Sequence, residues 1–216
     1  MRNQFIRGAE MYNFIIFDVD GTLIDTEKAV EESYRCAFFK QAGRQLTREE
    51  ISKAYGIPTV LAFERLGVSD VDSACQIYYD CLFKAFKKVK PFEGVAEMLA
   101  EVKRLGLGSG IVTSRNRSEV ANDSSLQCLL KYIDHVICVE DTQKHKPDAE
   151  PVTRLLEIAG RDRSETIYLG DTLYDYMCAK NAGVKFALAA WGASRTDGIE
   201  ADYVLQRPWD LITRVY

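Results

Sequence analysis

Short apolar runs alternate with stretches of helical periodicity along most of the chain. Strands of a buried parallel sheet are apolar without strict alternation, because helices cover both faces of the sheet. Such runs occur at residues 14–17, 110–113, 135–139, 166–169, 185–190 and, more weakly, 203–205. The pattern predicts an α/β fold with a doubly wound parallel sheet, in which ligands bind beyond the carboxyl ends of the strands.

Amphipathic helices are predicted between the later strands. Residues 93–105 carry apolar side chains three or four positions apart, and Gly106 follows as a candidate C-cap. The same reasoning predicts helices over residues 148–159 and 172–181, each with a glycine close behind its last residue. Strands that alternate with helices along the chain are typical of a doubly wound sheet.

The segment between the first two strands has no strand-like run. Residues 24–90 instead predict four helices, and a Thr or Asp at each start is a candidate N-cap. These helices are expected over residues 26–42, 47–55, 59–66 and 70–89. The sequence therefore predicts an α/β core of residues 11–23 and 91–216, a helical cap domain of residues 24–90, and an N-terminal extension, residues 1–10.

Composition places the chain among well-cored globular proteins. Its 216 residues are 47% hydrophobic and 28% charged, which excludes a disordered scaffold. A net charge of −4 without a long basic run is not typical of proteins that bind nucleic acid or anionic membranes. The six cysteines form no C-x-x-C pair, so we expect reduced thiols. With no apolar signal segment, we predict a cytoplasmic protein, monomeric or dimeric.

Two acids follow the first predicted strand and stand two residues apart, Asp18 and Asp20. Alternate side chains at a strand end point the same way, so both carboxylates could face one site. Gly21 then lets the backbone turn sharply. Two neighbouring anions are unfavourable unless a cation or a shared proton compensates them. Taken alone, the pair could also be a solvated turn.

Polar groups follow three further strands. Thr113 and Ser114 could donate to an anionic oxygen, and Ser114 also begins a predicted helix, whose free amides favour anions. Lys146 follows the next strand, and Asp171 and Asp175 follow another, with oxygens that suit Mg²⁺. Each group alone could be an ordinary N-cap or a solvated charge. Together they place acids, hydroxyls and a lysine at one edge of one sheet, which predicts a functional site.

These residues resemble the motifs of the haloacid dehalogenase superfamily, whose members are mostly phosphatases. Asp18-Val19-Asp20-Gly21-Thr22 matches the first motif, D-x-D-G-T, and the run from Gly170 to Asp175 matches the fourth, G-D-[ST]-x-x-D. Thr113 or its neighbour Ser114 falls at the second motif, with Thr113 the better match, and Lys146 falls at the third. The insert after the first motif resembles the C1-type helical cap of subfamily I, and downstream segments resemble its phosphoglycolate-phosphatase-like branch.

The resemblance implies a Mg²⁺-dependent phosphatase that hydrolyses a small phosphorylated metabolite, such as phosphoglycolate or a sugar phosphate. It implies that Asp18 is the nucleophile, which becomes an aspartyl-phosphate, and that Asp20 is the general acid and base. The implied phosphate-binding residues are Thr113, Ser114 and Lys146. The implied metal ligands are the Asp18 side chain, the backbone carbonyl of Asp20 and the Asp171 side chain. Asp175 would either bind the metal through a water molecule or support Lys146.

The cap is expected to close over the phosphate and exclude water, with hinges near residues 23–26 and 89–94. The turn Gly56-Ile57-Pro58-Thr59 resembles one that presents amides or a hydroxyl to the leaving group, so Thr59 is a candidate substrate contact. A simple turn with Thr59 as N-cap explains the same residues. The aromatic residues expected to form the core of the cap are Phe38, Phe39, Tyr78, Tyr79, Phe83 and Phe86.

Other functions fit the same core residues. A phosphomutase of the β-phosphoglucomutase type would reorient a bisphosphate intermediate, and a pyrophosphatase or nucleotidase would differ in its leaving group. A non-catalytic binding module would keep the fold without turnover. The acid at position 20 favours a phosphate substrate over a haloacid, because a departing halide needs no proton.

Overall fold

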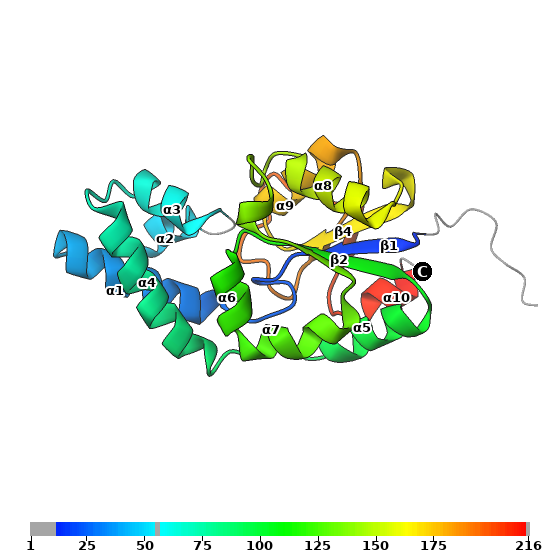
Figure 1. The fold of residues 1–216 in the computed structure, drawn as a ribbon, viewed down its shortest axis with the longest axis horizontal. Coiled ribbons are helices and arrows are strands. Elements are labelled where there is room, and N and C mark those ends of the chain that lie inside the picture. The colour runs from blue at the N-terminus through cyan, green and yellow to red at the C-terminus, as the bar shows by residue number, and fades with distance from the viewer. Residues whose placement is uncertain (1–11, 55–56, 215–216) are drawn as a thin grey trace, which may run out of the picture.

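A computed structural model of the chain shows a parallel sheet enclosed by helices, with a group of four further helices beside it (Figure 1). The structure describes residues 12–54 and 57–214. The predicted N-terminal extension, residues 1–10, and Gly56 of the predicted turn lie outside the described residues.

Within the described residues, six strands lie in the order β3-β2-β1-β4-β5-β6, and every neighbouring pair is parallel. The strands are β1 (Phe14–Phe17), β2 (Gly108–Val112), β3 (His135–Ile137), β4 (Thr166–Gly170), β5 (Lys185–Ala189) and β6 (Tyr203–Leu205). Strand β1 lies between β2 and β4, so its carboxyl end is next to theirs. The predicted doubly wound α/β sheet is confirmed.

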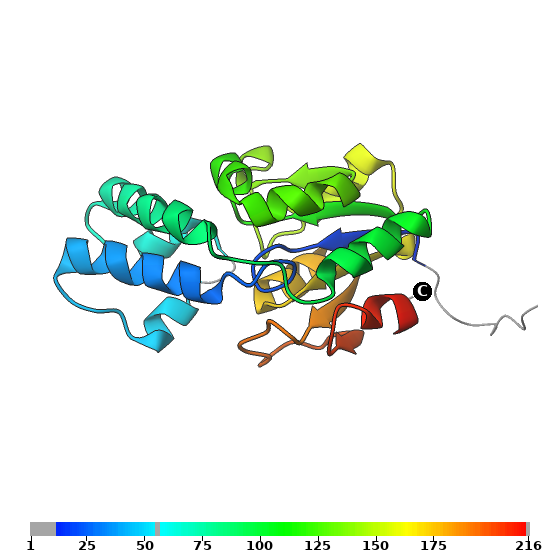
Figure 2. The ribbon, with the colours of Figure 1, turned by 90° about the horizontal axis from the view of Figure 1, so that it is seen from below.

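Helices cover both faces of the sheet (Figures 1 and 2). The helices on one face are α5 (Val95–Arg104), α7 (Ser124–Leu129) and α10 (Asp210–Arg214), and those on the other are α8 (Glu150–Ala159) and α9 (Leu173–Ala182). Alternate residues of β1 pack into the two layers, Ile15 and Phe17 into the first and Phe14 and Ile16 into the second. Burial on both faces explains why this strand is apolar throughout.

The group of four helices has an apolar core of its own. Its members are α1 (Glu27–Ala42), α2 (Arg48–Ser52), α3 (Thr59–Arg65) and α4 (Val71–Phe86). The rings of Tyr34, Phe63 and Tyr78 contact one another inside it. The prediction that Phe39 belongs to this core is wrong, because its side chain is 49% exposed. Phe38, the preceding residue of α1, is buried, and a helix turns neighbouring side chains to different directions.

Two chain segments join the helical group to the sheet, and they run side by side (Figure 2). The amide of Asp25 donates to the Lys90 carbonyl at 3.0 Å, and the amide of Phe92 donates to the Leu23 carbonyl at 3.1 Å. These bonds lie within the predicted hinge segments. The helical group therefore stands at the carboxyl end of β1, where Asp18 and Asp20 follow the strand (Figure 1).

Several predicted helix ends are confirmed by their caps. Thr47 accepts the amide of Glu50 in a capping box, and Asp70 accepts the amide of Ser73. Gly160 and Gly183 end their helices in the left-handed conformation. The predicted C-cap of α5, Gly106, is one residue too late, because Leu105 holds the cap position.

Helices α1 and α3 begin within one residue of the predicted positions, but neither has the predicted threonine cap, and the helix start predicted at Ser114 is wrong. Thr26 makes no capping hydrogen bond, because its hydroxyl donates to Asp20. Thr59 is the first residue of α3 and Pro58 holds the cap position. Ser114 does not begin a helix, because α6 (Arg117–Asn122) starts after Asn116, whose side chain caps it. No helix formed by the described residues is long and apolar enough to cross a membrane.

Candidate active site

Asp18 stands directly after β1 and is buried, with 6% of its surface exposed. Its amide donates to the Leu169 carbonyl at 2.9 Å and so continues the pairing with β4. Its carboxylate accepts a hydrogen bond from Lys146 Nζ at 2.5 Å. Burial and the nearby carboxylate of Asp175 raise the pKa of Asp18 to about 7, although Lys146 lowers it. The site thus contains a carboxylate whose charge is only partly compensated.

Lys146 is buried between two carboxylates and donates to Asp175 Oδ1 at 2.6 Å as well as to Asp18. Asp175 also accepts from the Tyr168 hydroxyl at 3.0 Å. Its second oxygen accepts from the amide of Thr172 at 3.0 Å and from the Thr172 hydroxyl at 2.5 Å. Both oxygens of Asp175 are therefore occupied by donors, which favours its support of Lys146 over a direct role as a metal ligand.

The acids of the first and fourth motifs converge although more than 150 residues separate them in the chain. Asp18, Asp171 and Asp175 each place one carboxylate oxygen within 4.8 Å of the others. Burial and repulsion from the other two carboxylates raise the pKa of Asp171 well above its usual value. Lys146 supplies one positive charge against three negative ones. A hard divalent cation such as Mg²⁺ would compensate the remainder, and Asp18 and Asp171 fit one as ligands.

Two positions at the site have room only for glycine, because neighbouring atoms lie very close to their backbone. Gly21 has a φ of +81°, and a Cβ there would lie 2.2 Å from an oxygen of Asp171. Gly192 follows β5, and a Cβ there would lie 1.8 Å from the carbonyl oxygen of Gly21. The turn after Asp20 is therefore held between the fourth motif and the loop after β5, and any side chain at these two positions would displace it.

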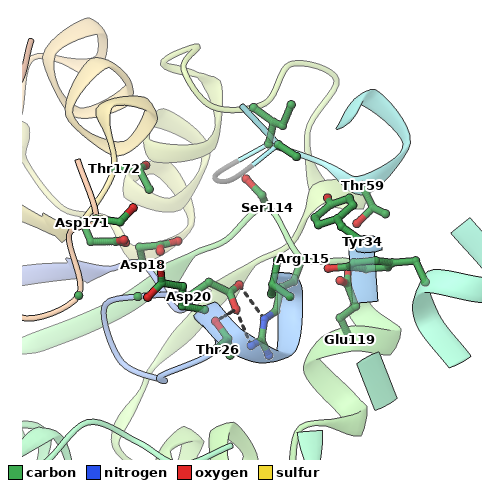
Figure 3. A pocket seen from close by; sticks show the side chains of 18 residues that line it. Asp18, Asp20, Thr26, Tyr34, Thr59, Ser114, Arg115, Glu119, Asp171 and Thr172 are labelled. Atoms are coloured by element: carbon green, nitrogen blue, oxygen red, sulfur yellow. Dashed lines mark hydrogen bonds and ion pairs between the residues drawn. The ribbon is translucent and has the colours of Figure 1, made fainter. Parts of the chain in front are cut away.

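Asp20 is held by a fork of hydrogen bonds from Arg115, whose Nε and Nη2 donate at 2.9 Å and 2.8 Å (Figure 3). The Thr26 hydroxyl donates to the same carboxylate at 2.6 Å. Burial alone would raise the pKa of Asp20, but Arg115 and Thr26 outweigh it, and the pKa lies below its usual value. Asp20 is therefore ionised in this arrangement and acts as a hydrogen-bond acceptor.

Arg115 is a site residue that the sequence analysis missed. Only 3% exposed, it donates a further hydrogen bond to the fully buried Asp123 at 2.9 Å. Its guanidinium lies 4.6 Å from the ring centre of Phe86, the last residue of α4. Its position directly after the predicted phosphate-binding pair was a signal. Its partners are distant in sequence, however, and an arginine is most often exposed.

The second motif lies at the carboxyl end of β2, beside β1. The Thr113 hydroxyl accepts a hydrogen bond from the amide of Arg115 at 3.1 Å, and Thr113 is 5% exposed. Ser114 lines the cavity described next. Ser114 therefore faces the cavity that the acids also line, whereas the buried Thr113 hydroxyl is engaged with the backbone.

A cavity of about 90 Å³ lies between the sheet's carboxyl edge and the helical group. The predicted site residues that line it are Asp18, Asp20, Thr59, Ser114 and Asp171. Figure 3 shows Asp18 and Asp171 at one side, Thr59 and Tyr34 at the other, and Arg115 between them. Lys146 and Asp175 are buried, and Lys146 pairs with both Asp18 and Asp175. The arrangement offers an anionic end, whose carboxylates could hold a cation, and a second end lined by the hydroxyls of Tyr34 and Thr59.

Glu119, on α6, also lines the cavity and was not predicted. Its carboxylate accepts the amide of Asn116 at 2.8 Å, which completes the cap of α6. Figure 3 places it near Tyr34, away from Asp18. Burial raises the pKa of Glu119 to about 7, although the Asn116 bond and Arg115 lower it. The second end of the cavity therefore contains a carboxyl group that takes up a proton more readily than an exposed glutamate does.

Replacing Glu119 by Gln is expected to stabilise the protein increasingly as the pH rises. The folded pKa, about 7, exceeds the unfolded value, so the folded state holds the extra proton. Wild-type stability should then fall as the pH rises through that interval, by up to about 3 kcal/mol. Gln keeps the acceptor for Asn116 and lacks the charge. Urea unfolding at pH 5 and pH 8 measures the difference, with the exposed Glu157→Gln as control. Parallel pH profiles for wild type and Glu119→Gln would contradict this expectation.

Comparisons with known proteins cover most of the chain. Residues 15–189 match the family described as haloacid dehalogenase-like hydrolase. Pyrophosphatase PpaX of Bacillus velezensis is 35% identical over 207 residues, which cover 92% of this chain and 94% of that protein. The PpaX of Bacillus mycoides is 29% identical over 204 residues, covering 93% and 95%.

Solved structures share the fold of this chain. A crystal structure from Lactobacillus plantarum, named provisionally as a phosphoglycolate phosphatase, has a TM-score of 0.85 at 25% identity and covers 94% of this chain and 99% of that chain. A hydrolase from Pseudomonas syringae has a TM-score of 0.83 at 20% identity, with coverage of 94% and 97%. Both similarities include the sheet and the helical group.

Proposed function

Because the chain belongs to the haloacid dehalogenase-like hydrolase family, we propose that it is a phosphatase that transfers a phosphoryl group to Asp18 and then to water. The observation that carries the proposal is the buried cluster of Asp18, Asp171 and Lys146 at the edge of a cavity. It offers a nucleophile, a place for a cation and a fixed positive charge in one enclosed space. The proposed substrate is a small phosphorylated metabolite.

Asp18 is the proposed nucleophile. One of its oxygens is held by Lys146, and the other attacks phosphorus while the bond to the leaving oxygen breaks. Ser114, which lines the cavity, then faces the phosphoryl oxygens, and Lys146 offsets their charge from its place beside Asp18. When bound by Asp18 and Asp171, Mg²⁺ would neutralise the carboxylates and polarise the phosphoryl group.

Asp20 is the proposed acid and base, and its contacts favour one of these two roles. Arg115 and Thr26 keep it ionised, which suits removal of a proton from the water that hydrolyses the aspartyl-phosphate. Protonation of a leaving alkoxide requires Asp20 to take up a proton first. Arg115 is thus proposed as the residue that positions Asp20 and sets its charge.

Pyrophosphate hydrolysis is the second candidate, and the ionised state of Asp20 favours it. A leaving phosphate is a much weaker base than an alkoxide and departs without a proton from the enzyme. PpaX relatives named as pyrophosphatases match over most of the chain, which supports this alternative.

We propose that residues 24–90 act as a cap domain over the core formed by residues 11–23 and 91–216. Thr59 and Tyr34 reach the cavity from this segment, so they would contact the leaving group when it closes. The two hinge segments are hydrogen-bonded to each other, so the cap would rotate about both of them together.

A substrate panel with and without a chelator tests the function. We expect release of inorganic phosphate from at least one of phosphoglycolate, sugar phosphates, nucleotides and pyrophosphate, and loss of that release when divalent ions are chelated. Isomerisation of a sugar phosphate without net phosphate release would instead indicate a phosphomutase. Phosphate release that survives full chelation would contradict the proposed role of the acids.

Magnesium is expected to stabilise the fold through Asp171. At a concentration about a hundredfold above its dissociation constant, a bound ion adds roughly 2.7 kcal/mol and should raise the melting temperature by about 5 °C or more. Asp171→Asn should remove most of this shift, because it removes one carboxylate of the cluster. The exposed Asp197→Asn is the matched control. A magnesium shift of equal size in Asp171→Asn would disprove the assignment of that ligand.

A further inference from the structure

Two cysteines of the helical group lie in contact. Cys36 on α1 and Cys81 on α4 bring their Sγ atoms to 2.8 Å, although 45 positions separate them in the chain. Helices α1 and α4 pack against each other along their lengths (Figures 1 and 2). At the far end of the same contact, Gln41 donates to the Ser73 hydroxyl at 2.7 Å. The helix packing itself therefore holds the two thiols together.

Small molecules have access to this pair of thiols. Both cysteines are partly exposed, whereas Cys75, Cys138 and Cys178 are buried. Cys81 also lines a groove of about 730 Å³ beside the hinge segment. The lysines that line this groove are Lys28, Lys84, Lys88 and Lys90. Asp25, Glu32 and Glu93 line the same groove, so charges of both signs surround it, and a small reagent can reach the Cys81 thiol at its wall.

We propose that Cys36 and Cys81 form a reversible disulfide that ties α1 to α4. The oxidant is a small-molecule disulfide such as oxidised glutathione. The thiolate of Cys81 attacks one sulfur of the reagent, which makes a mixed disulfide and releases one thiolate. The thiolate of Cys36 then attacks the sulfur of Cys81, so that the second thiolate leaves, and the two protons of the cysteines go to the two released thiolates.

The consequences follow from where the bond lies. It would close a loop over residues 36–81 and restrict the unfolded chain, which stabilises the helical group. Both cysteines stand on the same side of the hinge segments, and the bond would not join the helices to the sheet. Turnover at the cavity should therefore be little changed. This inference does not depend on the proposed function.

Mass spectrometry under a glutathione redox buffer tests the bond. Burial raises the pKa of Cys81 to about 11, so the exchange should be run at about pH 8.5, where more thiolate is present. We expect the native protein to lose the mass of two hydrogen atoms and to yield a peptide pair linked through Cys36 and Cys81. Cys36→Ser should instead accumulate glutathione on Cys81. Cys128→Ser, which removes the exposed thiol of α7, should form the link like wild type.

Two results would overturn the proposal. One is a native protein that takes up glutathione at Cys128 but leaves Cys36 and Cys81 reduced. The other is a linked peptide that appears only after denaturation. The oxidised protein should also melt roughly 5 °C or more above its reduced form, a difference absent from Cys36→Ser. Equal melting temperatures in a fully linked sample would contradict the stabilising effect.

Discussion

Replacing Asp18 by Asn is expected to lower turnover by at least about three orders of magnitude while the protein stays folded. An amide oxygen is a poor nucleophile and cannot carry the phosphoryl group as a carboxylate does. The fold should tolerate the change, because Asn matches Asp in size and still offers an oxygen to Lys146. It also relieves repulsion between Asp18 and Asp175.

Initial rates with p-nitrophenyl phosphate and Mg²⁺, together with thermal unfolding, measure both parts of this expectation. The exposed Asp72→Asn serves as control, since it makes the same chemical change outside the cavity. If the Asp18→Asn variant hydrolysed p-nitrophenyl phosphate at the wild-type rate, the nucleophile would be another group. An unfolded variant would contradict the predicted tolerance of the fold.

Replacing Arg115 by Met is expected to cost about 3 kcal/mol of stability at neutral pH, because it leaves the fully buried Asp123 and the partly exposed Asp20 without their partner. Asp20 and Asp123 both lose an ion pair, while Met keeps an apolar contact with Phe86. The folded pKa of Asp20 is lowered, so the stability that this pair contributes is present above the unfolded pKa. That contribution disappears as the pH falls through the folded value. The difference between wild type and variant should therefore shrink towards pH 3.

The same variant should change the pH dependence of turnover. Without Arg115, the pKa of Asp20 rises, so the general acid stays protonated to higher pH and the base becomes active only at higher pH. Urea unfolding at several pH values and pH–rate profiles provide the two measurements. Arg115→Lys, which keeps the charge but loses the fork, should lie between Met and wild type. Unchanged pH–rate profiles in Arg115→Met would refute the positioning role.

The strands could be predicted because a parallel sheet demands apolar runs on both faces, and β1 is such a run. The predictions of α5, α8 and α9 came from apolar spacing, and those of α1 to α4 from the lack of a strand-like run and from a Thr or Asp at each start. Helices α6, α7 and α10 have five or six residues each, too few for a periodic pattern to be recognised. The caps Asn116 and Asp123 were the available signals for α6 and α7.

The candidate site divides in the same way. Asp18, Asp20 and Asp171 could be predicted because each stands in a short local motif after a strand. Arg115 and Glu119 could not, because their burial depends on residues of the helical group such as Phe86 and Tyr34. The error at Phe39 has the same origin, since only the packing of α1 decides which aromatic side chain faces inward.

A crystal structure with Mg²⁺ and beryllium fluoride tests the central claim most directly, because this anion mimics a phosphoryl group bonded to a carboxylate. We predict that beryllium is bonded to an oxygen of Asp18, that a metal ion lies between Asp18 and Asp171, and that Lys146 contacts a fluorine. Beryllium fluoride bonded to a different residue, or a metal ion that contacts neither acid, would contradict the account.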